Sequence, residues 1–159
     1  MPLTLRSPAF QDHGAIPTVH TCDGADTAPP LEWSDVPAGT KSLVLVVDDP
    51  DAPNPMAPTH THVHWVLYDI PPSTTSLPAG GAVPDGAREG LNSWRHTGYG
   101  GPCPPIGCHR YFFKLHALDT TLGDRGTPTA DALDKLIRAH VIERAELVGT
   151  YQCEPGRTH

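Results

Sequence analysis

The chain has 159 residues, of which 38% are hydrophobic and 18% charged, and its formal net charge is −7. This composition is too apolar and too weakly charged for a disordered chain, and the length fits a single domain over residues 1–159. The negative charge, with no dense Lys/Arg cluster, tells against nucleic-acid binding. Nineteen prolines and 15 glycines without a period exclude collagen and indicate many loops around a sheet.

Signals for targeting and for cysteine chemistry are few. The longest apolar run, residues 43–47, is too short to span a bilayer. The N-terminus lacks a basic stretch followed by an apolar segment, so we expect no secretory signal and a cytoplasmic protein. The four cysteines, Cys22, Cys103, Cys108 and Cys153, form no CxxC pair. We expect free or buried thiols rather than disulfides, although a local Cys103–Cys108 bridge is geometrically allowed and a zinc site is disfavoured.

The first half of the chain predicts two neighbouring strands joined by a rigid loop. Residues 42–47 are apolar and β-branched, as in a buried strand. Residues 48–53 should form a loop, because they contain two prolines and three acids. Residues 62–70 alternate and predict the next strand. Regular alternation would place His62, His64, Val66 and Tyr68 on one face, and Val63, Trp65 and Leu67 on the other.

The second half predicts a long loop, two strands and one helix. Residues 73–108 are rich in Gly and Pro, and so long a loop in a compact domain suggests a functional role. Residues 110–118 and 147–151 alternate as strands. Between them, Thr127 looks like an N-cap followed by proline, and apolar residues at helical spacing predict a helix over residues 128–143. The fold is therefore a β-sandwich or large sheet with a helix near the C-terminus.

Two acids follow the first buried strand. Asp49 and Asp51 could belong to an ordinary solvated turn, because Asp and Pro are common turn residues. They could instead accept a histidine N–H and fix its tautomer. His64, near the start of the next strand, is the natural partner. The residues alone leave both interpretations open.

A second candidate segment, residues 98–113, combines glycines, prolines and hydrogen-bond donors. Gly100 and Gly101 allow the backbone to approach a ligand closely, and the prolines that follow would stiffen a wall. His109 and Tyr111 are two residues apart, so their side chains project from one face of a strand. A histidine N–H and a tyrosine O–H are suitable donors to phosphate or carboxylate oxygens. The segment could therefore form a small-anion site, but a His-x-Tyr pair on a strand is more often part of the packing, and the residues alone leave both interpretations open.

Three segments carry a family resemblance: DDPDAP, HWVLYDIP and GYGGPCPPIGCHRYFFKLHALD. In this order they resemble the phosphatidylethanolamine-binding protein family, in its compact bacterial Raf-kinase-inhibitor-like branch, and the flanking SPAF, TCDG and AELVGTY agree. The resemblance implies a mainly β fold, a β-sandwich of a large and a small sheet with one or two peripheral helices. It also implies a cavity that binds the phosphate of phosphoethanolamine-like phospholipid headgroups, or other small anions, without catalysis or a cofactor.

The resemblance assigns the cavity to named positions. It implies these site residues: Asp49, Asp51, Pro53, His64, Gly101, Pro102, Cys103, Pro104, Pro105, His109 and Tyr111. His62 joins them, where relatives often have a Trp, so a titratable group would replace an aromatic wall. Arg110 should be a structural ion-pair partner. Inhibition of a kinase or protease and a homodimer are further expectations from the family.

Two rival functions stay open. His60, His62 and His64 could bind a metal ion together with Asp49 or Asp51. A hydrolase could use the acid–base groups of the same cavity, although no nucleophile motif is evident.

As a binding site, the cavity should hold an anion through hydrogen bonds from His64, His109 and Tyr111, with Asp49 orienting one imidazole. The wall from Gly101 to Pro105 should exclude bulky groups. Because imidazoles protonate below about pH 6.5, anion affinity should rise as the pH falls.

Overall fold

The computed structural model describes residues 2–52, 56–104 and 107–152 and consists mainly of strands. The large sheet contains β2 (Gly14–Ala15), β4 (Ser42–Ala52), β5 (His60–Ile70), β7 (Arg88–Glu89), β8 (Cys108–Leu118) and β9 (Val141–Gln152). The small sheet contains β1 (Thr4–Arg6), β3 (Leu31–Ser34) and β6 (Ser76–Leu77). The helices are the 3₁₀ turn η1 (Thr18–His20) and α1 (Ala130–Ile137). The predicted β-sandwich of a large and a small sheet is confirmed.

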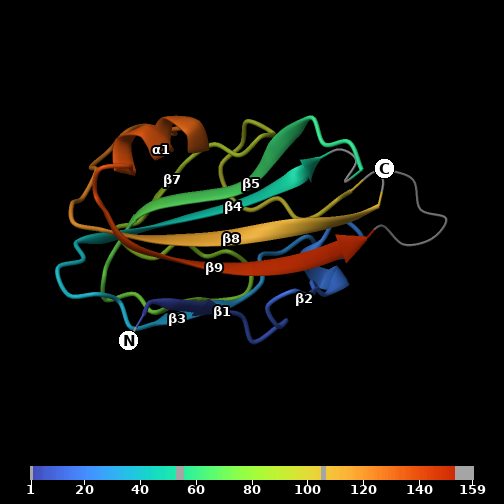
Figure 1. Ribbon diagram of the computed structural model, residues 1–159, viewed down its shortest axis with the longest axis horizontal. Coiled ribbons are helices and arrows are strands. Elements are labelled where there is room, and N and C mark those ends of the chain that lie inside the picture. The colour runs from blue at the N-terminus through green and yellow to red at the C-terminus, as the bar shows by residue number, and fades with distance from the viewer. Residues whose placement is uncertain (1, 53–55, 105–106, 153–159) are drawn as a thin grey trace.

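The six strands of the large sheet follow the order β2-β9-β8-β4-β5-β7, and the small sheet has the order β1-β3-β6. Strands β4, β5, β8 and β9 are long and antiparallel, whereas the short β2 pairs in parallel with β9. Figure 1 shows α1 and the small sheet on opposite sides of these strands. Residues 42–47 of β4 are buried on both faces, because alternate side chains meet the small sheet and α1.

A register shift changes which face the histidines occupy. Val47 pairs with Trp65, but the next residue of β4, Asp48, pairs with Val63, so His64 is an extra residue in β5. Val63 packs with the core under α1, and the His64 ring contacts Tyr111 in the opposite core. The expectation that His64 shares a face with Val66 is therefore wrong. The bulge turns it toward the small-sheet side.

Strand β4 continues through the acids that were expected to form a loop. It runs to Ala52, and Asp48, Asp49 and Asp51 are all buried. The pairing with β5 is irregular between Asp49 and Ala52, where Pro50 lies. A bulge is where a strand tolerates proline, because no ladder hydrogen bond needs its missing N–H. Pairing with the neighbouring strands thus overrides the turn signal of this segment.

The predicted helix exists, but its bounds were wrong. It spans Ala130–Ile137 and buries Leu133 and Ile137, and its N-cap is Thr129, whose side chain accepts a hydrogen bond from the Ala132 N–H. The expected continuation to residue 143 is strand, because β9 begins at Val141 and pairs along β8. In the described part of the chain, no helix is long and apolar enough to cross a membrane.

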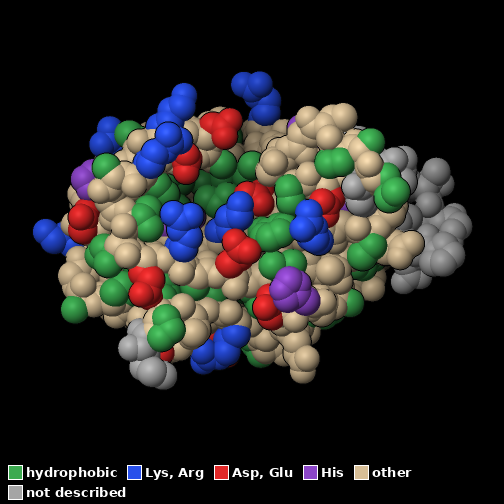
Figure 2. Space-filling model, viewed as in Figure 1, with side chains coloured by type: hydrophobic (Ala, Val, Ile, Leu, Met, Phe, Trp, Pro, Cys, Tyr) green, Lys and Arg blue, Asp and Glu red, His purple; other side chains and the backbone are tan. Residues whose placement is uncertain are grey.

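The face of the large sheet beside α1 is hollowed. A cleft of about 840 Å³ lies between α1, β8, β9 and residues 91–95, with Val46 and Val63 among its apolar lining. Figure 2 shows hydrophobic side chains in this hollow, with charged side chains of both signs around it. Asp48 and Lys114 form an ion pair there at 3.0 Å. Of the candidate site residues that the structure describes, only His60, a candidate metal ligand, lines this cleft.

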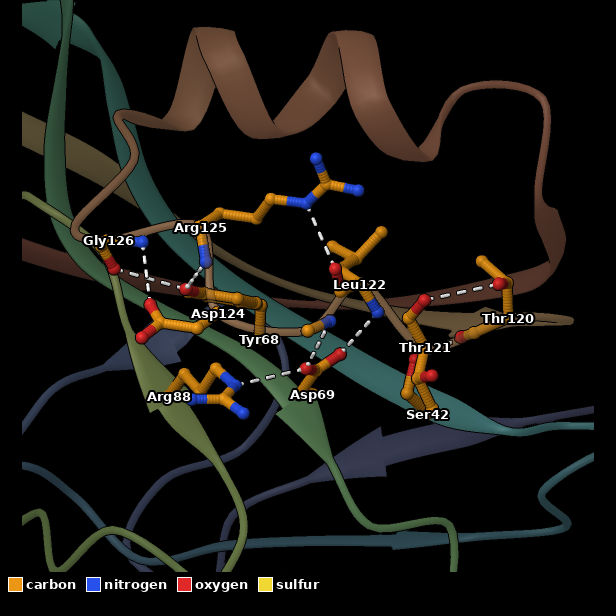
Figure 3. A network of polar contacts seen from close by, with 11 residues as sticks. Ser42, Tyr68, Asp69, Arg88, Thr120, Thr121, Leu122, Asp124, Arg125 and Gly126 are labelled. Carbon is orange, nitrogen blue, oxygen red and sulfur yellow. Dashed lines mark hydrogen bonds and ion pairs between the residues drawn. The ribbon is translucent and has the colours of Figure 1, made fainter.

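Asp69 holds the turn after β8 against the end of β5 (Figure 3). Its carboxylate accepts hydrogen bonds from the N–H groups of Leu122 and Gly123, at 2.8 and 2.9 Å, and contacts Arg88 Nε at 3.3 Å. Its backbone is in the left-handed region, with φ of 53°. The Tyr68 hydroxyl beside it accepts from the Arg125 N–H. These contacts fix the segment that leads into α1.

Replacing Asp69 with Ala should lower the free energy of unfolding by about 2–3 kcal/mol, because two backbone N–H groups lose a charged acceptor. Asp69→Asn should cost about half as much, since Asn keeps an acceptor oxygen and tolerates positive φ. Urea denaturation measures both. The control is Asp124→Ala, which removes one exposed hydrogen bond in the same turn. Equal effects of Asp69→Ala and Asp124→Ala would contradict the assigned role.

Candidate functional site

A smaller cavity, of about 360 Å³, lies where β4 ends and β5 and β8 begin. Its lining residues are Asp49, Ala52, His60, His62, His64, Trp94, Cys103, Pro104, His109 and Tyr111. Most of the site residues predicted from the sequence are among them. Asp51, Gly101 and Pro102 are described but do not line the cavity, and Pro53 and Pro105 lie outside the described residues.

A buried hydrogen bond joins Asp49 to His109. The distance from Oδ2 of Asp49 to Nδ1 of His109 is 2.6 Å, and the side chains are 5% and 1% exposed. Because a carboxylate oxygen accepts, Nδ1 of His109 carries the proton that it donates. Asp49 also accepts from the Asp51 N–H at 2.7 Å. The expected orienting role of Asp49 is present, but its partner is His109 and not His64.

His64 is buried and neutral in the free protein. Its Nδ1 lies 2.7 Å from the Gly100 carbonyl oxygen, which can only accept, so Nδ1 is the donor. Burial lowers the pKa of His64 to about 3, although the Gly100 carbonyl favours the charged form; nearby His62 lowers it further. The second ring nitrogen, Nε2, is then a lone-pair acceptor at neutral pH. His64 can donate to an anion only if it takes up a proton.

Tyr111 supplies a hydrogen-bond donor to the same cavity. Its ring stacks beside His109, with centroids 6.3 Å apart and planes 18° apart, and meets the edge of His64 at 5.2 Å. Burial and the nearby charge of Asp49 raise the pKa of the phenol, so the hydroxyl stays protonated. Among the described residues, no hydrogen-bond partner is found for this hydroxyl. It is available to an oxygen of a ligand.

Trp94 forms an aromatic wall that was not anticipated. Its ring lies 4.4 Å from His62 and 5.1 Å from His64 between centroids, and the residue is 41% exposed. A Cβ at Gly100 would lie 2.2 Å from the Trp94 ring, so only glycine permits this approach. The aromatic surface expected to be lost at His62 is therefore restored from the long loop. The sequence signal that could have identified Trp94 is the presence of a large aromatic residue in the Gly- and Pro-rich residues 73–108.

Behind the cavity wall, the backbone of Gly101 and Pro102 packs on the segment around η1. The Gly101 N–H donates to Oδ1 of Asp26 at 2.8 Å, and the Cys22 N–H donates to the Pro102 carbonyl at 3.1 Å. A Cβ at Gly101 would lie 2.4 Å from the His20 carbonyl oxygen. The close approach predicted for this glycine is thus made to the protein's own backbone and not to a ligand.

A disulfide joins Cys22 to Cys103, with Cα atoms 5.4 Å apart and a sequence separation of 81 residues. The expectation of free thiols is wrong for these two, and the local Cys103–Cys108 bridge is not formed. So distant a pairing leaves no spacing signal in a sequence. Cys108 is an exposed free thiol, and Cys153 lies outside the described residues.

Asp51 and Arg110 form a structural ion pair, as expected for Arg110. The guanidinium donates to both carboxylate oxygens, at 2.8 and 3.0 Å, and the Arg110 N–H donates at 2.9 Å. These hydrogen bonds lower the pKa of Asp51. The pair joins the end of β4 to β8 beside the cavity. Both carboxylate oxygens of Asp51 are thus engaged by Arg110.

The metal-site alternative finds no support in the geometry. Across the three described segments, no group of three His, Cys, Asp or Glu side chains is placed to hold a metal ion. The rings of His60 and His62 are 6.3 Å apart and those of His62 and His64 are 4.9 Å apart, in edge-to-face contacts. Burial lowers the pKa of His62, as it does for His64. The three rings pack as an aromatic cluster with Trp94.

Comparison with known proteins identifies the family of the chain. Residues 6–152 match the family model described as "Phosphatidylethanolamine-binding protein". The UPF0098 protein of Methanothermobacter thermautotrophicus is 45% identical over 155 residues, covering 94% of this chain and 99% of that protein. Its name states no activity.

Two solved structures are also similar. A Chlamydia trachomatis protein, described as a homolog of phosphatidylethanolamine-binding protein, superposes with a TM-score of 0.90 at 39% identity, covering 96% of this chain and 99% of that one. Escherichia coli YbcL, described as a member of the mammalian family, has a TM-score of 0.87 at 32% identity, covering 97% and 100%. The chain belongs to the phosphatidylethanolamine-binding protein family.

Proposed function

We propose that the chain is a non-catalytic binding protein whose smaller cavity takes a partly protonated oxyanion, such as inorganic phosphate or the phosphate monoester phosphoethanolamine. The observation that carries this proposal is the convergence of Asp49, His64, His109 and Tyr111 on one cavity. They come from three strands, and each is nearly inaccessible to solvent. Buried polar groups on a common cavity are the usual mark of a ligand site.

The polar groups match an oxyanion that both accepts and donates hydrogen bonds. The Tyr111 hydroxyl is a donor, and its raised pKa keeps it one. Nε2 of neutral His64 is an acceptor for a P–O–H hydrogen, or takes that proton and becomes a donor. Phosphate monoesters carry their second proton near pH 6, so both forms exist at neutral pH. The cavity therefore favours a phosphate over an ion that cannot bring a proton.

The alternative of a hydrolase has less support. Among the described lining residues there is no Ser or Thr, and the sulfur of Cys103 is held in the disulfide. The Asp49 carboxylate is engaged with His109 and the Asp51 N–H. A nucleophile activated by a base would need a group that is not committed in this way. Inhibition of a kinase or protease, and a homodimer, remain proposals by family analogy alone.

Tyr111→Phe should weaken phosphate binding by about 1 kcal/mol, or about fivefold in Kd, because one donor to the ligand is lost. Titration calorimetry with phosphate, phosphoethanolamine and ethanolamine measures this and separates phosphate from headgroup recognition. The matched control is Tyr68→Phe, which removes a buried hydroxyl in the opposite core. An unchanged Kd for Tyr111→Phe, or an equal loss for Tyr68→Phe, would count against the site.

Sulfate affinity should rise by up to about tenfold per pH unit as the pH falls from about 8 to 5.5, because binding adds one proton. The free His64 has a pKa of about 3. An anion beside Nε2 raises that pKa, so the complex binds more protons than the free protein. Sulfate itself does not titrate in this range, which assigns the proton to the protein.

Calorimetry in two buffers of different ionisation enthalpy counts the protons taken up. In His64→Asn, the amide can still donate to the Gly100 carbonyl, but the acceptor Nε2 is gone. This variant should bind sulfate without proton uptake. Undiminished uptake in His64→Asn would show that another group titrates.

A further inference from the structure

One wall of the cavity, residues 99–103, packs on residues 20–26, which we call the η1 segment. Residues 99–103 contact residues 20–26 through the hydrogen bonds of Gly101 and Pro102 described above, and the Tyr99 hydroxyl donates to the His20 carbonyl at 2.7 Å. On the other side, the Gly100 N–H donates to the His64 carbonyl and the Gly100 carbonyl accepts from Nδ1 of His64. The wall thus lies between the η1 segment and the cavity.

The disulfide is the covalent part of this attachment. Cys103 lines the cavity, and its partner Cys22 belongs to the η1 segment. The hydrogen bonds named above involve Tyr99, Gly101 and Pro102. The disulfide adds a covalent bond at the next residue, Cys103, and so restrains a part of the wall that lines the cavity.

We propose that the Cys22–Cys103 disulfide is a redox-dependent latch on the anion site: the oxidised protein binds the oxyanion tightly, and the reduced protein binds it weakly. The proposal rests on the proposed function, because it assigns a regulation to that same cavity. Reduction removes the covalent restraint on residues 99–103, while their hydrogen bonds to residues 20–26 remain. Gly100 holds Nδ1 of His64 and packs on Trp94, so the added freedom of this segment loosens the position of the His64 ring.

The redox step is ordinary thiol–disulfide exchange. A dithiol reductant attacks one sulfur of the Cys22–Cys103 bond, the bond breaks, and both cysteines become thiols as the reductant closes to its own disulfide. Both half-cystines are partly exposed, so a thiolate can reach the bond. The reduced form would dominate in a reducing compartment and the oxidised form in an oxidising one.

The coupling must be reciprocal. If oxidation tightens phosphate binding tenfold, saturating phosphate must shift the thiol–disulfide equilibrium tenfold toward the disulfide. For a two-electron couple, that factor corresponds to about 30 mV. A latch that acts on the site therefore has a second signature, which can be measured without a binding titration.

The test uses the full chain with Cys108→Ser and Cys153→Ser, so that Cys22 and Cys103 are the only thiols. Phosphate Kd is measured by calorimetry for the oxidised protein and after reduction with dithiothreitol. We expect about tenfold weaker binding after reduction, within the usual range of allosteric coupling. Adding Cys22→Ser and Cys103→Ser should give the weak Kd with and without reductant. Backbone amide exchange should be faster at Gly101 and Cys22 in the reduced form.

Each outcome is decisive. Equal phosphate Kd values for the oxidised and reduced proteins would overturn the latch and leave the proposed function standing. A reduced protein that unfolds as a whole, seen by circular dichroism, would also overturn the latch, because the reduced state must stay folded. No phosphate binding by the oxidised protein would overturn the proposed function and the latch together.

Discussion

The cavity depends on one buried hydrogen bond, the 2.6 Å contact between Asp49 and Nδ1 of His109. A carboxylate removed from water is costly unless donors surround it, and here His109 and the Asp51 N–H supply them. The bond joins the end of β4 to the start of β8. It also sets the plane of His109, on which Tyr111 stacks. Removing one partner would leave the other buried without its hydrogen bond. Substitution of either residue should therefore disrupt the cavity.

A second constraint is the neutrality of His64. Its ring is enclosed by Tyr111, His62 and Trp94, and burial keeps it uncharged at neutral pH. The free cavity thus contains no fixed positive imidazole at this position. An incoming oxyanion would bring the charge that makes protonation favourable. The orientation of His64 depends on residues 99–103, because the Gly100 carbonyl accepts the hydrogen bond from Nδ1 of His64.

Much of the fold was predictable, because the continuous apolar run over residues 42–47 and the alternation along residues 110–118 reflect burial directly. The bulge at His64 was not, since nothing in residues 62–70 marks an extra residue against β4. For the same reason the sequence favours His64, the nearer histidine, as the partner of Asp49, whereas the structure pairs Asp49 with His109. The helix end was misplaced, because Val141 continues a helical spacing and yet gains more by pairing with β8.

The site was predictable as a set of residues and not as an arrangement. The family motifs identified His64, His109 and Tyr111, which do line one cavity. Trp94 escaped notice, because its role depends on a close approach to Gly100 that only the folded chain shows. The Cys22–Cys103 bond depends equally on long-range folding.

The most direct test is a crystal structure of the protein grown with phosphate at neutral pH. The account predicts a phosphate in the smaller cavity, with one oxygen within hydrogen-bonding distance of the Tyr111 hydroxyl and another near the imidazole of His64. A phosphate found instead in the larger cleft beside α1, with only water in the smaller cavity, would contradict it.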